Sequence, residues 1–132
     1  MNDIGLVSIS NVVCQTGISM GGVATALSAS DDGLKEAIKI WQERRDLLLD
    51  ELKDFTIIPL HGGWSFLLDV RPLGITSENL SNKLLKEAKV ATTPMIGWEK
   101  ETVNYVRFVF SNESKERLVG IGKKIKKALG LL

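Results

Sequence analysis

The stretch that decides the fold reads Tyr105-Val106-Arg107-Phe108-Val109-Phe110. Its largest apolar side chains alternate, which places Val106, Phe108 and Phe110 on one side of the backbone. Such alternation is typical of a β-strand that is buried on one face. The other side carries Arg107, so the stretch predicts a sheet with one core face and one face that presents an arginine.

The segments around this strand predict further helices and strands in the order α-α-β-β-α-β-β-α. The expected helices cover residues 17–30, 31–53, 76–88 and 112–132. The expected strands cover residues 55–59, 64–70, 90–93 and 105–110. Trp64, Phe66, Leu68 and Val70 share one face of the second strand. The short connections predict an α+β fold, a small antiparallel or mixed sheet covered by helices.

Polar residues mark the expected helix starts. Ser30-Asp31-Asp32 offers oxygen acceptors before the long second helix, and Thr76 or Ser77 does so before the third. Asn112 is expected to cap the last helix, with Glu113 at its positive end. These residue types satisfy the unpaired N–H groups of a first helical turn.

The composition is that of an ordinary globular domain. The chain has 132 residues, 44% hydrophobic and 25% charged, with a net charge of +1. These values exclude a disordered, collagen-like or coiled-coil chain, and no overall charge favours nucleic acid as a partner. A single cysteine, Cys14, and a single histidine, His61, build neither a disulfide framework nor a structural zinc site. We therefore expect no metal and a reducing, cytoplasmic compartment.

A segment of 27 residues, Ile4 to Ser30, carries no charge. Its length suits a membrane span, but serines, asparagine, glutamine and glycines interrupt it, so we expect no membrane insertion. No Lys or Arg precedes it, which argues against a signal peptide. We expect protein to cover residues 1–30, through self-association or a neighbouring chain, or else poor order there. Residues 31–132 then form the domain proper.

Arg107 is the most informative polar residue. A guanidinium within an apolar strand is costly unless it is paired, and its planar fork suits a carboxylate ligand. An ion pair with Asp69 or Glu99, or plain exposure to solvent, would explain it equally well. The glycines at 17, 21 and 22 lack the ending of a phosphate-binding loop, and the lysine-rich C-terminal helix is typical of a solvated face.

Several segments, taken in order, resemble the C-terminal domain of the class I and II aminotransferases, which have the aspartate aminotransferase fold. The resemblance covers nearly the whole chain. It rests on Glu43-Arg44-Arg45-Asp46-x-Leu48, Pro59-x-x-Gly62-Gly63-x-x-Phe66-x-x-Asp69, Leu84-Leu85-Lys86-Glu87-Ala88-Lys89-Val90-Ala91 and Tyr105-Val106-Arg107-Phe108. One departure is Met95, which follows Pro94 where the family often has glycine.

The resemblance implies a role for Arg107, because the matching arginine of the family binds the α-carboxylate of the amino acid substrate. It also implies pyridoxal phosphate as the cofactor of the whole enzyme, with amino acids and 2-oxo acids as substrates. The family's cofactor lysine lies in a Ser-x-x-Lys context in a large domain, and no lysine here has that context. We therefore expect a fragment that is inactive alone, binds no cofactor, has no catalytic residue of its own and belongs to a homo-oligomer.

A second reading has no enzyme in it. A free-standing α+β module could bind a protein partner through residues 4–30, or RNA through the lysine-rich helix and the strand at Tyr105. The strand lacks the glycine that the RNA-recognition motif requires after a basic residue, and the net charge is low.

Overall fold

The computed structural model describes residues 17–30 and 33–132 of the chain. They fall into two compact units, which divide between Ala37 and Ile38. The first contains α2 (Gly17–Ser28), and the chain enters the second within α3 (Leu34–Glu51).

Helix α2 confirms the helix expected at residues 17–30, with its end at Ser28. None of its residues is buried, and the side chains of Ile18 and Leu27 are 93% and 83% exposed. The rest of the charge-free segment and the acidic pair Asp31-Asp32 lie outside the described residues. How protein covers residues 1–30 therefore stays a prediction.

The sheet of the second unit has three antiparallel strands in the order β1-β3-β2. They are β1 (Ser65–Asp69), β2 (Thr93–Pro94) and β3 (Tyr105–Val109). Phe66 pairs with Phe108 across β1 and β3, and their rings stack with centroids 5.5 Å apart. The core face expected for residues 105–110 is thereby confirmed, and the sheet is antiparallel rather than mixed.

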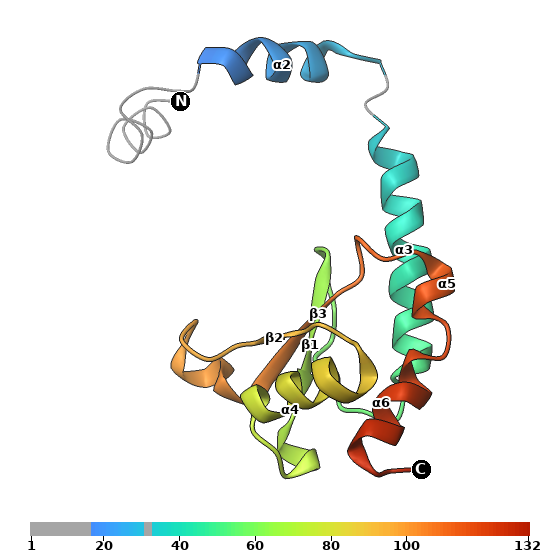
Figure 1. The fold of residues 1–132 in the computed structure, drawn as a ribbon. Helices are drawn as coiled ribbons and strands as arrows, with labels where there is room; N and C mark the ends of the chain where they lie inside the picture. Colours follow the sequence, from blue (N-terminus) through green and yellow to red (C-terminus); the bar gives the residue numbers. More distant parts are fainter. Residues whose placement is uncertain (1–16, 31–32) are drawn as a thin grey trace. The chain divides into compact units, whose positions relative to one another are not determined.

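Helices cover the core face of this sheet (Figure 1). They are α3, α4 (Ser77–Lys83), a π-helical turn η2 (Leu84–Ala88), α5 (Lys115–Leu118) and α6 (Ile121–Leu129). A single cluster of buried side chains joins them to the strands; it includes Leu48, Leu52, Phe66, Leu68, Leu80, Leu84, Val106, Phe108, Phe110, Leu118, Ile121 and Ile125. The α+β fold class is confirmed.

Contacts far apart in the sequence bind α3 to the last two helices. The Glu51 carboxylate accepts hydrogen bonds from the backbone N–H of Gly120 at 2.7 Å and of Gly122 at 3.1 Å. Ion pairs join Lys115 to Glu43 and Lys126 to Asp54. A carboxylate at a helix N-terminus satisfies unpaired N–H groups and the positive end of the helix dipole, so Glu51 fixes where α6 begins.

Two expected strands are shorter in the structure. Residues 55–59 make one bridge, between Ile57 and Leu68, flanked by the hydrogen bonds Asp69 N–H to Thr56 O and Ile58 N–H to Leu67 O. The strand expected at residues 90–93 is reduced to Thr93–Pro94. The nitrogen of Pro94 carries no hydrogen to donate to a ladder, which limits pairing there.

The expected last helix is divided in two. Gly120 adopts a left-handed conformation with φ of 77°, and this break separates α5 from α6. Asn112 was the wrong cap, because Ser114 holds the N-cap position of α5. Thr76 is confirmed as the cap of α4, since its side chain accepts a hydrogen bond from the Asn79 N–H at 3.3 Å. No helix in the described part of the chain is long and apolar enough to cross a membrane.

Candidate functional site

Arg107 lies at the centre of β3, the middle strand. Its backbone pairs with Leu67 of β1 on one side and Thr93 of β2 on the other. Its neighbours Val106 and Phe108 are buried in the core, and side chains alternate along a strand. Arg107 therefore rises from the sheet face opposite the helices, where it is half-buried.

Two indole rings flank the Arg107 guanidinium. Its Cζ lies 4.9 Å from the centroid of the Trp98 ring and 5.5 Å from that of Trp64. Both distances lie within the range of cation–π attraction. The Nε atom is buried and has no hydrogen-bond partner among the described residues. An unsatisfied buried N–H is uncommon in folded proteins, and this one belongs to a group that binds carboxylates well.

Neither acid considered from the sequence pairs with Arg107. The Asp69 carboxylate binds Arg71 instead, and the Glu99 side chain accepts a backbone N–H in a capping box at η3 (Lys100–Asn104). Within residues 33–132, no ion pair to Arg107 is formed. The guanidinium is thus held by aromatic rings while its charge has no acidic counterpart in this part of the chain.

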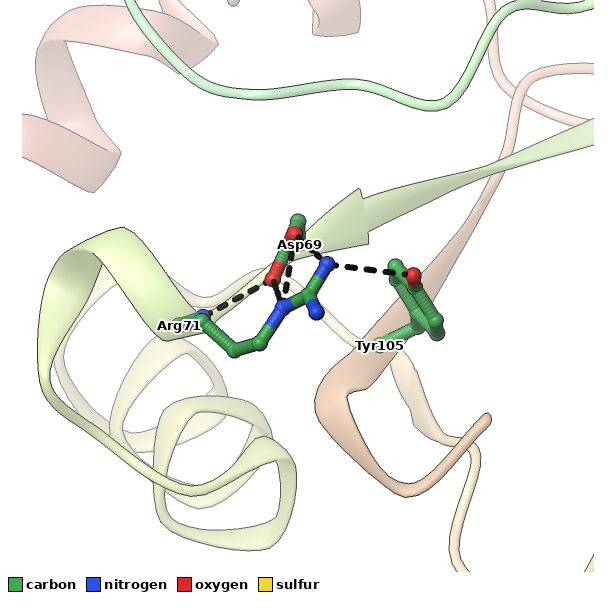
Figure 2. Close-up of polar contacts among 3 residues, drawn as sticks. All are labelled: Asp69, Arg71 and Tyr105. Atoms are coloured by element: carbon green, nitrogen blue, oxygen red, sulfur yellow. Dashed lines mark hydrogen bonds and ion pairs between the residues drawn. The ribbon is translucent and has the colours of Figure 1, made fainter. Parts of the chain in front are cut away.

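Asp69, Arg71 and Tyr105 form a polar cluster between the end of β1 and the start of β3 (Figure 2). The Arg71 guanidinium donates to both Asp69 oxygens at 2.6–3.0 Å, and its backbone N–H donates to Oδ1 at 2.9 Å. A guanidinium nitrogen also donates to the Tyr105 hydroxyl at 3.4 Å. Hydrogen bonds from Arg71 lower the pKa of Asp69 although burial opposes this. The cluster holds Tyr105 two residues from Arg107.

The loop that carries Trp98 is tied down at both ends. The Met95 N–H donates to the Tyr105 carbonyl at 3.1 Å, and the Met95 side chain is buried. The Thr102 hydroxyl accepts the Glu99 N–H at 3.2 Å. Gly97 has a φ of 82°, a conformation that glycine adopts without strain. The departure from the family pattern at Met95 therefore gives an anchored loop that brings Trp98 to Arg107.

The other candidate residues lie elsewhere. His61, Gly62 and Gly63 line a groove of about 350 Å³ together with Trp41 and Arg45 of α3. Lys126 of the lysine-rich helix binds Asp54, and Cys14 lies outside the described residues. No group of three or more potential metal ligands occurs among residues 17–30 and 33–132.

Sequence reasoning missed the two indoles. Trp64 was expected on the core face with Phe66, but it precedes β1 and is 49% exposed beside Arg107. Trp98, 61% exposed, was expected only somewhere in a loop. The available signal was that both tryptophans sit next to turn glycines, Gly63 and Gly97, on the segments that flank the arginine strand.

Comparison with known proteins gives a consistent family. The sequence model described as "Aminotransferase class I and II" matches residues 5–119. The probable aspartate aminotransferase of Methanocaldococcus jannaschii is 30% identical over 115 residues, which cover 85% of this chain and 30% of that protein. The LL-diaminopimelate aminotransferase of Moorella thermoacetica is 26% identical over 121 residues, covering 86% of this chain and 29% of that protein.

A solved structure has the same fold. The crystal structure of the aromatic aminotransferase from Pyrococcus horikoshii superposes with a TM-score of 0.81 at 24% identity, covering 95% of this chain and 34% of that one. The chain thus spans about 30% of the length of the curated relatives that it matches.

Proposed function

The chain belongs to the class I and II aminotransferases, and from this premise we propose that it is the C-terminal small domain of a pyridoxal-phosphate-dependent enzyme. Residues 1–30 would be its entry segment with an interdomain helix, and residues 31–132 the small domain. Matches that cover most of this chain but about 30% of each relative support this proposal.

Arg107 would bind the α-carboxylate of the substrate. The observation that carries this role is a half-buried guanidinium on the open face of the sheet with no ion pair in the described part of the chain. A guanidinium fork binds a carboxylate through two parallel hydrogen bonds, which fixes both its position and its orientation. The sheet and the Asp69–Arg71–Tyr105 cluster would keep the strand of Arg107 in place for this purpose.

The described residues do not fit pyridoxal phosphate by themselves. The cofactor needs a lysine amine and a set of donors for its phosphate. Described lysines 53, 83, 115 and 126 bind carboxylates, and Lys89 donates to the Lys86 carbonyl. The groups found against the Arg107 guanidinium are indole rings. We derive no cofactor step here, and the chain alone is proposed to be inactive.

In the whole enzyme, the domain would take part in moving an amino group from an amino acid to a 2-oxo acid. The relatives are named for aspartate and for LL-diaminopimelate, so an acidic or a diamino substrate is within the family's range. A large domain, a second copy of the chain and a cytoplasmic location complete the proposal.

Carboxylate binding tests the role of Arg107. We would titrate the isotope-labelled chain with propanoate and follow the backbone amides of β3 by NMR. Arg107→Met should weaken binding about tenfold or more, because a hydrogen bond to a charged group contributes about 1.5–3 kcal/mol. Arg107→Lys should weaken it less, since the charge stays but the fork is lost. Arg117→Met, on an exposed arginine of α5, is the matched control. Equal propanoate affinity in the native chain and Arg107→Met would refute the role.

Activity tests the proposed incompetence. We would add pyridoxal phosphate with an amino acid and a 2-oxo acid to the purified chain, and measure turnover and the visible absorption of the cofactor. No turnover and no stoichiometric change in absorption are expected. Transamination by this chain alone would contradict the proposal.

A further inference from the structure

Two half-exposed tryptophans beside one arginine call for an explanation beyond carboxylate binding. Trp64 and Trp98 reach Arg107 from different segments, one just before β1 and the other in the loop that leads to η3. Each keeps about half or more of its surface open, at 49% and 61%. Large apolar side chains gathered at an exposed site typically mark a place where a ligand or partner binds.

Each indole has one use already and surface left for a second. The ring centroids lie 4.9 and 5.5 Å from Cζ of Arg107, which restricts the guanidinium without occupying it with an acid. A carboxylate bound to that guanidinium would bring the atoms attached to it against the open indole surface. A flat or apolar group there would gain ring contacts, whereas a second carboxylate would lose its water.

The arginine nearest along the same strand pair is not free to bind a second acid. Arg71 contacts Tyr105, two residues before Arg107, but its guanidinium is bound to both oxygens of Asp69. Recruiting it would break a bidentate ion pair with a buried carboxylate. The described surroundings of Arg107 therefore favour one carboxylate and an apolar remainder.

From this arrangement we infer that Arg107, Trp64 and Trp98 form a subsite that selects monocarboxylates with an aromatic or flat apolar group over dicarboxylates. This inference rests on the proposed role of Arg107 and adds the substrate class. Trp64 and Trp98 are both positioning residues for the guanidinium and specificity determinants for the ligand. The corresponding substrates of the whole enzyme are aromatic or apolar amino acids and their 2-oxo acids.

Three ligands test the inference on the full chain: propanoate, 3-phenylpropanoate and succinate. The indole N–H signals of Trp41, Trp64 and Trp98 report separately by NMR, and Trp41 of α3 serves as an internal control because it lines a different groove. We expect 3-phenylpropanoate to bind about two- to tenfold more tightly than propanoate, the gain that ring contacts give. It should shift the signals of Trp64 and Trp98 more than that of Trp41. Succinate should bind no more tightly than propanoate after allowance for its two equivalent carboxylates.

Variants separate this inference from the role of Arg107. Trp98→Leu and Trp64→Leu should each lower the preference for 3-phenylpropanoate over propanoate toward one, whereas Trp41→Phe should leave it unchanged. An unchanged preference in both leucine variants would overturn the aromatic subsite, and so would succinate as the tightest ligand. If Arg107→Met abolishes the binding of both monocarboxylates in that case, the role of Arg107 stands and the subsite alone fails. Equal binding in Arg107→Met, or no shift with any acid in the native chain, would overturn both.

Discussion

Gly122, near the start of α6, tests whether the helices are packed as closely as the structure shows. It lies in a helix, is buried, and donates its N–H to the Glu51 carboxylate. A methyl group on its Cα would overlap the backbone carbonyl oxygen of Glu51 and lie 2.9 Å from the carbonyl carbon. Gly122→Ala therefore forces α6 away from the end of α3.

Two opposing effects set the magnitude. Replacing a helical glycine by alanine favours the helix by up to about 1 kcal/mol when nothing else changes. Overpacking typically costs about 1–3 kcal/mol, and the upper end applies here because the obstacle is backbone rather than a flexible side chain. Moving α6 also disturbs Ile121 and Ile125, which are buried in the core. We expect a net loss of about 2 kcal/mol in the free energy of unfolding.

Urea unfolding of the full chain, followed by circular dichroism, measures this loss. For a small domain, a slope of about 1–3 kcal/mol/M places the variant midpoint roughly 1 M lower. Gly62→Ala is the matched control, because a methyl group there meets nothing within 4 Å and its backbone is not left-handed. Its midpoint should stay the same or rise slightly.

The sign of the change decides the question. Helix propensity alone predicts that Gly122→Ala is more stable than the native chain, whereas close packing against Glu51 predicts the opposite. A variant as stable as the native chain would refute the packing of α6 on α3 described above.

Two further predictions concern Asp69 and Lys89. Asp69→Asn should cost about 1 kcal/mol at neutral pH, a modest value because the partner Arg71 is 60% exposed; since Arg71 lowers the pKa of Asp69 below its ordinary 3.8, this contribution is present above about pH 4 and disappears as the pH falls through the lowered pKa. Urea unfolding at pH 7 and pH 3 measures it, and a native-to-variant difference that does not shrink at pH 3 would contradict the assignment. Lys89→Gly should stabilise the chain by up to about 1 kcal/mol, because Lys89 has a left-handed φ of 58° after η2. Lys89→Ala is its control in thermal unfolding and should give no gain, and equal shifts in the two variants would show that backbone strain is not the cause.

Periodicity was sufficient where one face of an element is buried. The alternation at residues 105–110 located β3, and apolar residues three and four positions apart located α3 and α4. It failed where backbone chemistry ends an element. Pro94 limits β2, and the left-handed Gly120 separates α5 from α6, yet neither changes the spacing of apolar residues around it.

The candidate site was predictable in part. A lone arginine in an apolar strand stands out in the sequence, so Arg107 could be named. Its surroundings could not, because Trp64 and Trp98 reach it through turns whose geometry depends on Gly63 and Gly97. The choice between ion-pair partners was also out of reach, since Arg71 binds Asp69 through a local turn that spacing does not reveal.

The pairing of α3 with the last helices has a consequence for how the domain folds. Lys115 and Lys126 each bind an acid 72 positions earlier in the chain. Contacts between distant parts of a chain form late, because a long loop must close before they bring any stabilisation. During synthesis, Leu48 and Leu52 must therefore wait for Ile121 and Ile125 to leave the ribosome before their shared core can close. The last helices act as the clasp of the domain, and a nascent chain that stalls before them would expose the apolar surface that chaperones bind.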